Sequence, residues 1–245
     1  MTAIEAATSD GTAKGELLVP VGAGPFPLVV FYPDAGGLRA AMVDLAAQLT
    51  AAGYAALVVD PYWRHGDFTP FDARTVFTDP PERARLMAMV ATVVPATIAS
   101  DTDALVAAIA DPRVRTDRLG AVGYCMGGRL AFLLAQRWPE RVVAAAPIHA
   151  GGLVTDKPDS PHLGVDRIRA ALYLGVADDD SSCTPAHQGA LATALATAHV
   201  RYTLELYAGA RHGFAVPDFA VHDPAAAAHH HARVVALFRD HLAAA

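Results

Sequence analysis

One cysteine lies in a setting typical of a catalytic nucleophile. Gly123-Tyr124-Cys125-Met126-Gly127 follows an apolar run and comes directly before a helix-forming stretch. This is the strand–turn–helix context of the Gly-x-nucleophile-x-Gly turn, in which the glycines leave room for a tight, strained backbone. The N–H groups and dipole of the helix that follows favour a thiolate or an oxyanion. The pattern predicts a nucleophilic Cys125; the alternative is a buried structural cysteine in a glycine-rich turn.

A nucleophilic cysteine needs a base, and the base needs an acid that orients it. With this type of turn the chain order is nucleophile, acid, histidine. His212 follows a predicted strand in a segment of small residues, and three consecutive aspartates at 178–180 follow the strand before it. His149 also follows a strand, but it precedes every candidate acid. The order selects His212 as the base and leaves the choice among the three aspartates open.

Strand-like and helix-like segments alternate along the chain. This alternation predicts βαβ units and an α/β protein with a mostly parallel central sheet and helices on both faces. Ligands of such sheets bind beyond the carboxyl ends of the strands, where the candidate residues lie. We expect a single domain over residues 1–245, with an irregular functional loop at 61–81 and a tail at 243–245. The predicted strands are 28–32, 54–59, 119–123, 142–148, 170–176 and 201–207, and the predicted helices are 40–52, 82–94, 97–110, 126–137, 185–198 and 224–241.

The composition excludes several classes of protein. The 245 residues include 19 basic and 25 acidic side chains, a net charge of −6 that argues against a nucleic-acid-binding protein. The longest apolar runs, 55–59 and 142–148, are far shorter than the ~20 residues of a membrane-spanning helix. Two cysteines are too few for a disulfide scaffold, and the first residues lack the pattern of a secretory signal, so we expect a cytoplasmic protein. The histidines at 229–231 point in different directions on a helix, which predicts a solvated face rather than a metal site.

The chain resembles the dienelactone hydrolase family. This resemblance implies an α/β-hydrolase fold and a Cys-His-Asp triad that cleaves a lactone or ester bond, or a thioester. Aligning the strand at 173–177 with that of the family puts the acid on Asp180, with Asp178 as the second choice. The match extends from about residue 15 to 240 and is carried by segments 31–37, 52–54, 59–61, 123–128, 177–182 and 209–214.

The same resemblance implies roles around the nucleophile. The fold uses the backbone N–H groups of Ala35 and Met126 as an oxyanion hole. Asp34 stands where the family commonly has a glutamate that contacts the resting thiol, so Asp34 is a candidate for that contact. The alternative is a turn aspartate that bonds its own backbone.

Substrate-binding residues are less well defined. Family members that act on dienelactone hold the substrate carboxylate with arginines, one of them a few residues after the histidine, where this chain has Phe-Ala-Val-Pro at 214–217. Other arginines that could hold a substrate carboxylate are Arg64, Arg74, Arg83 and Arg211. Aromatic residues of the long loop either line a pocket or anchor the loop: Tyr62, Trp63, Phe68 and Phe71.

We therefore expect a carboxylic ester hydrolase that uses no cofactor and no metal. Its partner is a small ester or lactone, with no nucleic acid and no membrane, and it is a monomer or homodimer. The alternative is a catalytically silent or redox-sensing thiol protein on the same scaffold. Such a protein needs Cys125 but neither His212 nor the acid.

Overall fold

The computed structural model describes residues 1–242, and the expected tail at 243–245 lies outside them. An eight-stranded sheet has the order β1-β2-β4-β3-β5-β6-β7-β8. Strands β3 to β8 are parallel to one another, while β1 and β2 form an antiparallel hairpin that pairs with β4. The strands are β1 Thr2–Thr8, β2 Gly11–Leu18, β3 Phe26–Tyr32, β4 Ala55–Val59, β5 Val114–Tyr124, β6 Val142–Ile148, β7 Ala171–Asp179 and β8 Tyr202–Arg211.

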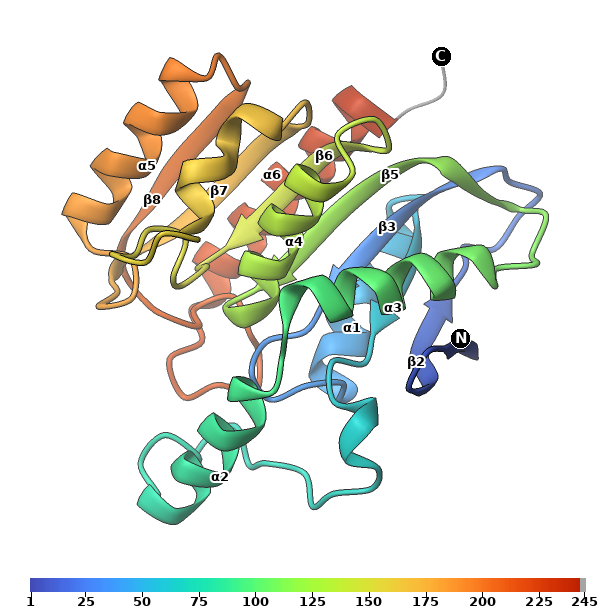
Figure 1. Ribbon diagram of the computed structural model, residues 1–245, viewed down its shortest axis with the longest axis horizontal. Coiled ribbons are helices and arrows are strands. Elements are labelled where there is room, and N and C mark those ends of the chain that lie inside the picture. Colours follow the sequence, from blue (N-terminus) through green and yellow to red (C-terminus); the bar gives the residue numbers. More distant parts are fainter. Residues whose placement is uncertain (243–245) are drawn as a thin grey trace.

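Helices cover both faces of this sheet, as the alternation predicts (Figure 1). Helices α1 and α6 pack on one face, against the side chains of Val29 and Phe31. Side chains of α3, α4 and α5 belong to a second cluster, on the other face, which contains Leu28 and Val30. The helices are α1 Ala40–Ala51, α2 Pro80–Ala91, α3 Pro95–Ala107, α4 Met126–Arg137, α5 Pro185–Thr197 and α6 Pro224–Leu242, with 3-10 turns η1 Trp63–His65 and η2 Pro161–Arg167.

The central strands are apolar because both of their faces are covered. All five residues of β4 are buried, and so are all but one residue of β6. Strands with two covered faces have near-continuous apolar sequences. The predicted α/β fold class with a mostly parallel sheet is confirmed.

Several boundaries differ from the predicted ones. Strand β5 begins at Val114 and β8 continues to Arg211, beyond the predicted end at residue 207. The register between β7 and β8 shifts near Gly209, which has a positive φ of 74°, so the strand continues past the irregularity. The β1–β2 hairpin is an addition to the predicted sheet.

The loop at 61–81 is irregular apart from η1, as predicted, and leads into α2. Figure 1 shows α2 standing away from the sheet, at the same end of the molecule as the loop that follows β8. Within residues 1–242 no single helix has the length and apolarity to cross a membrane; α2 and α3 reach that threshold only when taken together as a bent pair.

Candidate active site

Cys125 sits on the predicted turn between β5 and α4. Its φ of 54° and ψ of −114° are strained values for a residue with a side chain. A Cβ on Gly123 would lie 2.1 Å from the Gly127 carbonyl oxygen, and a Cβ on Gly127 would lie 2.1 Å from the Tyr32 carbonyl oxygen. The backbone is therefore too crowded for any residue other than glycine at these two positions.

The loops after β7 and β8 bring an acid and a base to this thiol. His212 Nε2 lies 3.0 Å from Cys125 Sγ, and His212 Nδ1 lies 2.7 Å from Asp180 Oδ2. The Asp180 side chain is buried, whereas the His212 side chain is 29% exposed. The three residues thus form a continuous array in which the imidazole is held between a carboxylate and a thiol.

The array favours the charged form of His212. Burial works against that charge, but interactions with Cys125 and with Asp180 outweigh it and raise the pKa of His212 to about 10. Burial likewise works to raise the pKa of Asp180, yet hydrogen bonds from His212 and Ser182 hold it below its ordinary value. Mutual stabilisation of opposite charges is the physical cause of both shifts.

The two neighbouring aspartates have other partners. Asp178 Oδ2 accepts a hydrogen bond from the Gly209 backbone N–H at 2.9 Å. Asp179 is exposed and pairs with Arg211 at 3.4 Å. Asp180 is therefore the member of this run that meets His212.

Ser182 also belongs to the array and is an addition to the predicted site. Its hydroxyl donates to Asp180 Oδ1 at 2.6 Å, and its backbone N–H donates to the same oxygen at 2.8 Å. The hydroxyl also lies 3.4 Å from His212 Nδ1. The signal for it in the sequence is an aspartate followed two residues later by serine, the pattern of a side chain that caps its own turn.

The backbone N–H groups of Met126 and Ala35 are the predicted donors of an oxyanion hole. Met126 is the first residue of α4, so its N–H has no partner within the helix. The N–H of Ala35 makes no hydrogen bond with any of residues 1–242. The Tyr62 hydroxyl donates to the Ala35 carbonyl at 2.7 Å and also contacts the Met126 sulfur, so one side chain holds both segments.

Asp34 does not have the predicted partner. Its fully buried carboxylate accepts two hydrogen bonds from Arg39, at 2.7 and 2.9 Å, and one from the Gly36 backbone N–H at 2.8 Å. No hydrogen bond joins it to Cys125 in the described part of the chain. The contact with Gly36 is the self-bonded turn that was the alternative, and Arg39 is the side-chain partner of Asp34.

Two other histidines are buried near this array. His149 is fully buried, and its ring centroid lies 5.2 Å from that of His212. The expectation of a solvated face at 229–231 is wrong for His230, which is 1% exposed and lies 3.2 Å from the Tyr124 hydroxyl. Burial lowers the pKa of His230 to about 4. His229 is exposed and pairs with Glu205.

The aromatic residues of the long loop separate into two groups. Tyr62, Phe68 and Phe71 pack in a cluster with Ala35 and with Met126, the residue that follows Cys125 in the chain. Trp63 instead donates to Asp101 of α3 at 3.0 Å, which makes it a loop anchor. Arg64 binds Asp101 and Asp10 and is likewise directed away from the array.

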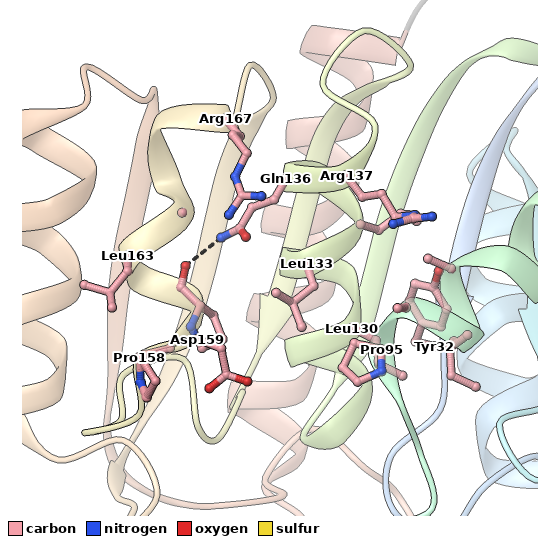
Figure 2. A pocket seen from close by; sticks show the side chains of 17 residues that line it. Tyr32, Pro95, Leu130, Leu133, Gln136, Arg137, Pro158, Asp159, Leu163 and Arg167 are labelled. Carbon is pink, nitrogen blue, oxygen red and sulfur yellow. Dashed lines mark hydrogen bonds between the residues drawn. The ribbon is translucent and has the colours of Figure 1, made fainter.

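A separate cavity of about 400 Å³ lies between α3, α4 and η2. Figure 2 shows this cavity and the hydrogen bond from the Gln136 side chain to the Pro161 carbonyl beside it. Its lining contains none of the three residues of the Cys125 array. The carboxyl edge of the sheet, not this cavity, holds the reactive groups.

Comparison with known proteins identifies the family of this chain. A model of the dienelactone hydrolase family matches residues 14–242. This chain belongs to the dienelactone hydrolase family. The resemblance predicted from the sequence is thereby confirmed, as is its class, a hydrolase of carboxylic ester or lactone bonds.

Individual relatives of this dienelactone hydrolase family member are distant. It is 26% identical over 239 residues to a putative carboxymethylenebutenolidase of Synechocystis sp. (strain ATCC 27184 / PCC 6803 / Kazusa), covering 93% of this chain and 92% of the relative. It is 31% identical over 109 residues to a carboxymethylenebutenolidase of Pseudomonas sp. (strain P51), covering 44% of each. The crystal structure of a putative dienelactone hydrolase from Klebsiella pneumoniae superposes with a TM-score of 0.83 at 22% identity, over 98% of this chain and 99% of the other. That likeness confirms the fold.

Proposed function

We propose that Cys125 is the nucleophile of this hydrolase and that His212 and Asp180 complete its triad. The substrate is a small lactone or ester, or a thioester. The observation that carries the proposal is the position of His212, with Nε2 3.0 Å from Cys125 Sγ and Nδ1 2.7 Å from Asp180. Such an array supplies a thiolate, a proton carrier and a group that orients the carrier.

In the first half-reaction the Cys125 thiolate attacks the substrate carbonyl carbon and forms a tetrahedral oxyanion. The N–H groups of Ala35 and Met126 stabilise that oxyanion, because neither has a partner among residues 1–242. The imidazolium of His212 then donates its proton to the leaving alkoxide as the carbon–oxygen bond breaks. The products are an alcohol and an acyl-thioester on Cys125.

In the second half-reaction neutral His212 takes a proton from water, and the hydroxide attacks the thioester carbonyl. Collapse of the tetrahedral intermediate releases the carboxylic acid and restores the thiolate–imidazolium pair. Asp180 keeps the imidazole in one orientation and stabilises its charged form throughout.

A redox-sensing thiol protein is the alternative. It requires a reactive Cys125 but gives no reason for a buried Asp180 behind His212. The continuous hydrogen-bonded array supports the hydrolase.

The experiment measures hydrolysis of activated esters, lactones and acyl-thioesters by the wild type and by Cys125→Ala and His212→Ala. We expect both variants to stay folded and to lose turnover. Full activity in folded Cys125→Ala contradicts the proposal. Iodoacetamide alkylation separates the alternatives, because labelling of Cys125 that is slowed by His212→Ala supports the triad, whereas labelling indifferent to His212 favours the redox protein.

We also propose a cellular location and partners for the protein. Cys125 and Cys183 are both free thiols, which suits the reducing cytoplasm. We expect no nucleic-acid or membrane partner, no cofactor and no metal, and a monomer or homodimer.

A further inference from the structure

Arg39 is saturated by two carboxylates. Its Nε and Nη2 donate to Asp218 at 2.7 and 2.9 Å, and its Nη1 and Nη2 donate to Asp34 at 2.7 and 2.9 Å. The remaining Nη1 hydrogen is directed at the Gly37 carbonyl oxygen, 3.3 Å away. A guanidinium has five N–H donors, and all five are used. Arg39 therefore has no donor left for a substrate.

This cluster of Asp34, Arg39 and Asp218 borders the reaction site. Asp34 directly precedes Ala35, whose carbonyl is held by Tyr62. On the other side, Phe219 follows Asp218 in the chain and lies 5.6 Å from the Arg39 guanidinium carbon. The cluster joins the loop that carries Ala35 to the loop that follows His212.

Phe219 also contacts the loop that carries His212. A Cβ on Gly213, the residue after His212, would lie 2.5 Å from the Phe219 ring, so that ring packs directly against the histidine loop. On its other side the ring meets Phe77 of the long loop, with centroids 5.9 Å apart.

The summed charge of the cluster is negative, because one guanidinium faces two carboxylates. Asp34 is fully buried and Asp218 is two-thirds buried, so solvent screens these charges incompletely. A substrate carboxylate that approaches this cluster is repelled by its negative charge and finds no unused hydrogen-bond donor on Arg39. Like-charge contacts of this kind disfavour a ligand by reducing its affinity.

Arg83 and Arg211, two of the arginines that the sequence offers for binding a substrate carboxylate, do not replace Arg39. Arg211 is exposed and paired with Asp179. Arg83 is exposed on α2 and lines a shallow groove with Phe77, Pro80, Ala84 and Met87, which contains none of the reactive residues. The wall beside the thiol is instead apolar and aromatic, formed by the cluster of Tyr62, Phe68 and Phe71.

We propose that this site selects esters or lactones with an uncharged, apolar acyl group, and that Asp218 is a specificity-determining residue because it cancels the charge of Arg39. The inference rests on the proposed function. Replacing Asp218 by asparagine leaves Arg39 facing a single carboxylate and frees part of its hydrogen-bonding capacity. The net charge of the cluster is then zero, so the cluster no longer repels a substrate carboxylate.

The test compares two esters of the same acyl length, p-nitrophenyl valerate and the mono-p-nitrophenyl ester of glutaric acid. The measured quantity is the ratio of their kcat/KM values in the wild type, in Asp218→Asn and in the control Arg83→Ala. We expect the wild type to prefer the valerate at least about tenfold. Asp218→Asn is expected to raise relative activity on the glutarate monoester at least about threefold, mainly through KM, and Arg83→Ala to leave the ratio unchanged.

A wild-type ratio near one, or a preference for the glutarate ester, overturns the inference, as does an unchanged ratio in folded Asp218→Asn. If that variant does not fold, the wild type still decides, because the inference requires it to prefer the valerate. If Cys125→Ala hydrolyses both esters as fast as the wild type, the proposed function itself fails; if turnover requires Cys125 but shows no preference, only the specificity proposal fails.

Discussion

His212 Nε2 lies 3.0 Å from Cys125 Sγ across a separation of 87 residues in the chain. The contact joins the strained turn between β5 and α4 to the end of β8, and β6 and β7 lie between these two strands in the sheet. Its partner contact, from His212 to Asp180, fixes the other ring nitrogen. Each ring nitrogen of His212 therefore has a defined partner, and the effect of each partner on the imidazole can be measured.

The first prediction concerns the charge of His212. Because the interaction with Cys125 helps to raise the pKa of His212 to about 10, Cys125→Ala is expected to lower that pKa toward the ordinary value near 6.5. An NMR titration of the His212 ring checks this, with the resonance assigned from a His212→Gln spectrum. Equal pKa values in the wild type and Cys125→Ala would show that the thiolate is not the cause.

The same raised pKa fixes the direction of its effect on stability. A histidine whose pKa is higher in the folded than in the unfolded state contributes fully below about pH 6.5, and this contribution is lost as the pH rises toward 10. Ester hydrolysis is expected to decline over the upper part of this range, since neutral His212 cannot protonate the leaving group.

The second prediction concerns the two thiols. Cys183 is buried, and burial raises its pKa to about 11, so it stays protonated at neutral pH. We expect iodoacetamide to add one label to the native protein, at Cys125, and two labels in urea. Mass spectrometry counts the labels, and native Cys125→Ala serves as the control that takes up none. Rapid labelling of Cys183 in the native state would contradict its burial.

The parts of the fold that the sequence predicts are those with a strong local signal. Continuous apolar runs identify β3, β4 and β6, because these strands are covered on both faces. The glycines of the turn identify Cys125, and the order of strand ends identifies His212. The hairpin β1–β2 has no such signal, because β1 is exposed or half-buried at every residue and contains polar and small side chains.

The contacts that the sequence does not predict join distant segments. Arg39 and Asp218 are 179 residues apart, and no local pattern pairs them. A run of three histidines is typical of a solvated helix face, yet the helix turns the middle one, His230, onto Tyr124. Such pairings depend on how the helices pack on the sheet, which periodicity alone does not determine.

The third prediction concerns the support of Asp180. Ser182→Ala removes a hydrogen bond of 2.6 Å to the carboxylate but leaves the one from the backbone N–H. We expect kcat/KM to fall about three- to tenfold, and the pKa of Asp180 to rise because its charged form loses a donor. Steady-state kinetics over a range of pH measure both effects, and Ser182→Thr is the matched control that keeps the hydroxyl. A loss of activity that Ser182→Thr shares in full would indicate a steric rather than a hydrogen-bonding role.

The fourth prediction concerns stability in acid. His230 is buried and neutral, with a pKa of about 4 compared with about 6.5 in the unfolded chain. Protons therefore bind the unfolded state preferentially, and stability falls as the pH drops below about 6.5. Linkage gives a loss of about 2 kcal/mol from this residue between pH 7.5 and 5. Urea unfolding at the two pH values is expected to show that the loss is smaller in His230→Gln. An identical acid loss in both proteins would assign it to other groups.

The fifth prediction contrasts two glycines in helices. Gly127 lies in the first turn of α4, where a Cβ would lie 2.1 Å from the Tyr32 carbonyl oxygen and 2.3 Å from that of Pro33. These atoms belong to the backbone at the end of β3 and the start of the loop that leads to Ala35, and cannot move aside without displacing that backbone. Gly127→Ala is therefore expected to lower the free energy of unfolding by more than about 3 kcal/mol or to prevent folding.

Gly189 is the matched control, because it is exposed within α5 and a Cβ there would meet nothing within 4 Å. Gly189→Ala is expected to stabilise the protein by about 0.5–1 kcal/mol, since alanine loses less backbone entropy in a helix. Urea unfolding of both variants separates a general preference of helices for alanine from the crowding of this turn. Equal stability changes in the two would mean that the approach of α4 to the Tyr32–Pro33 backbone is not what requires Gly127.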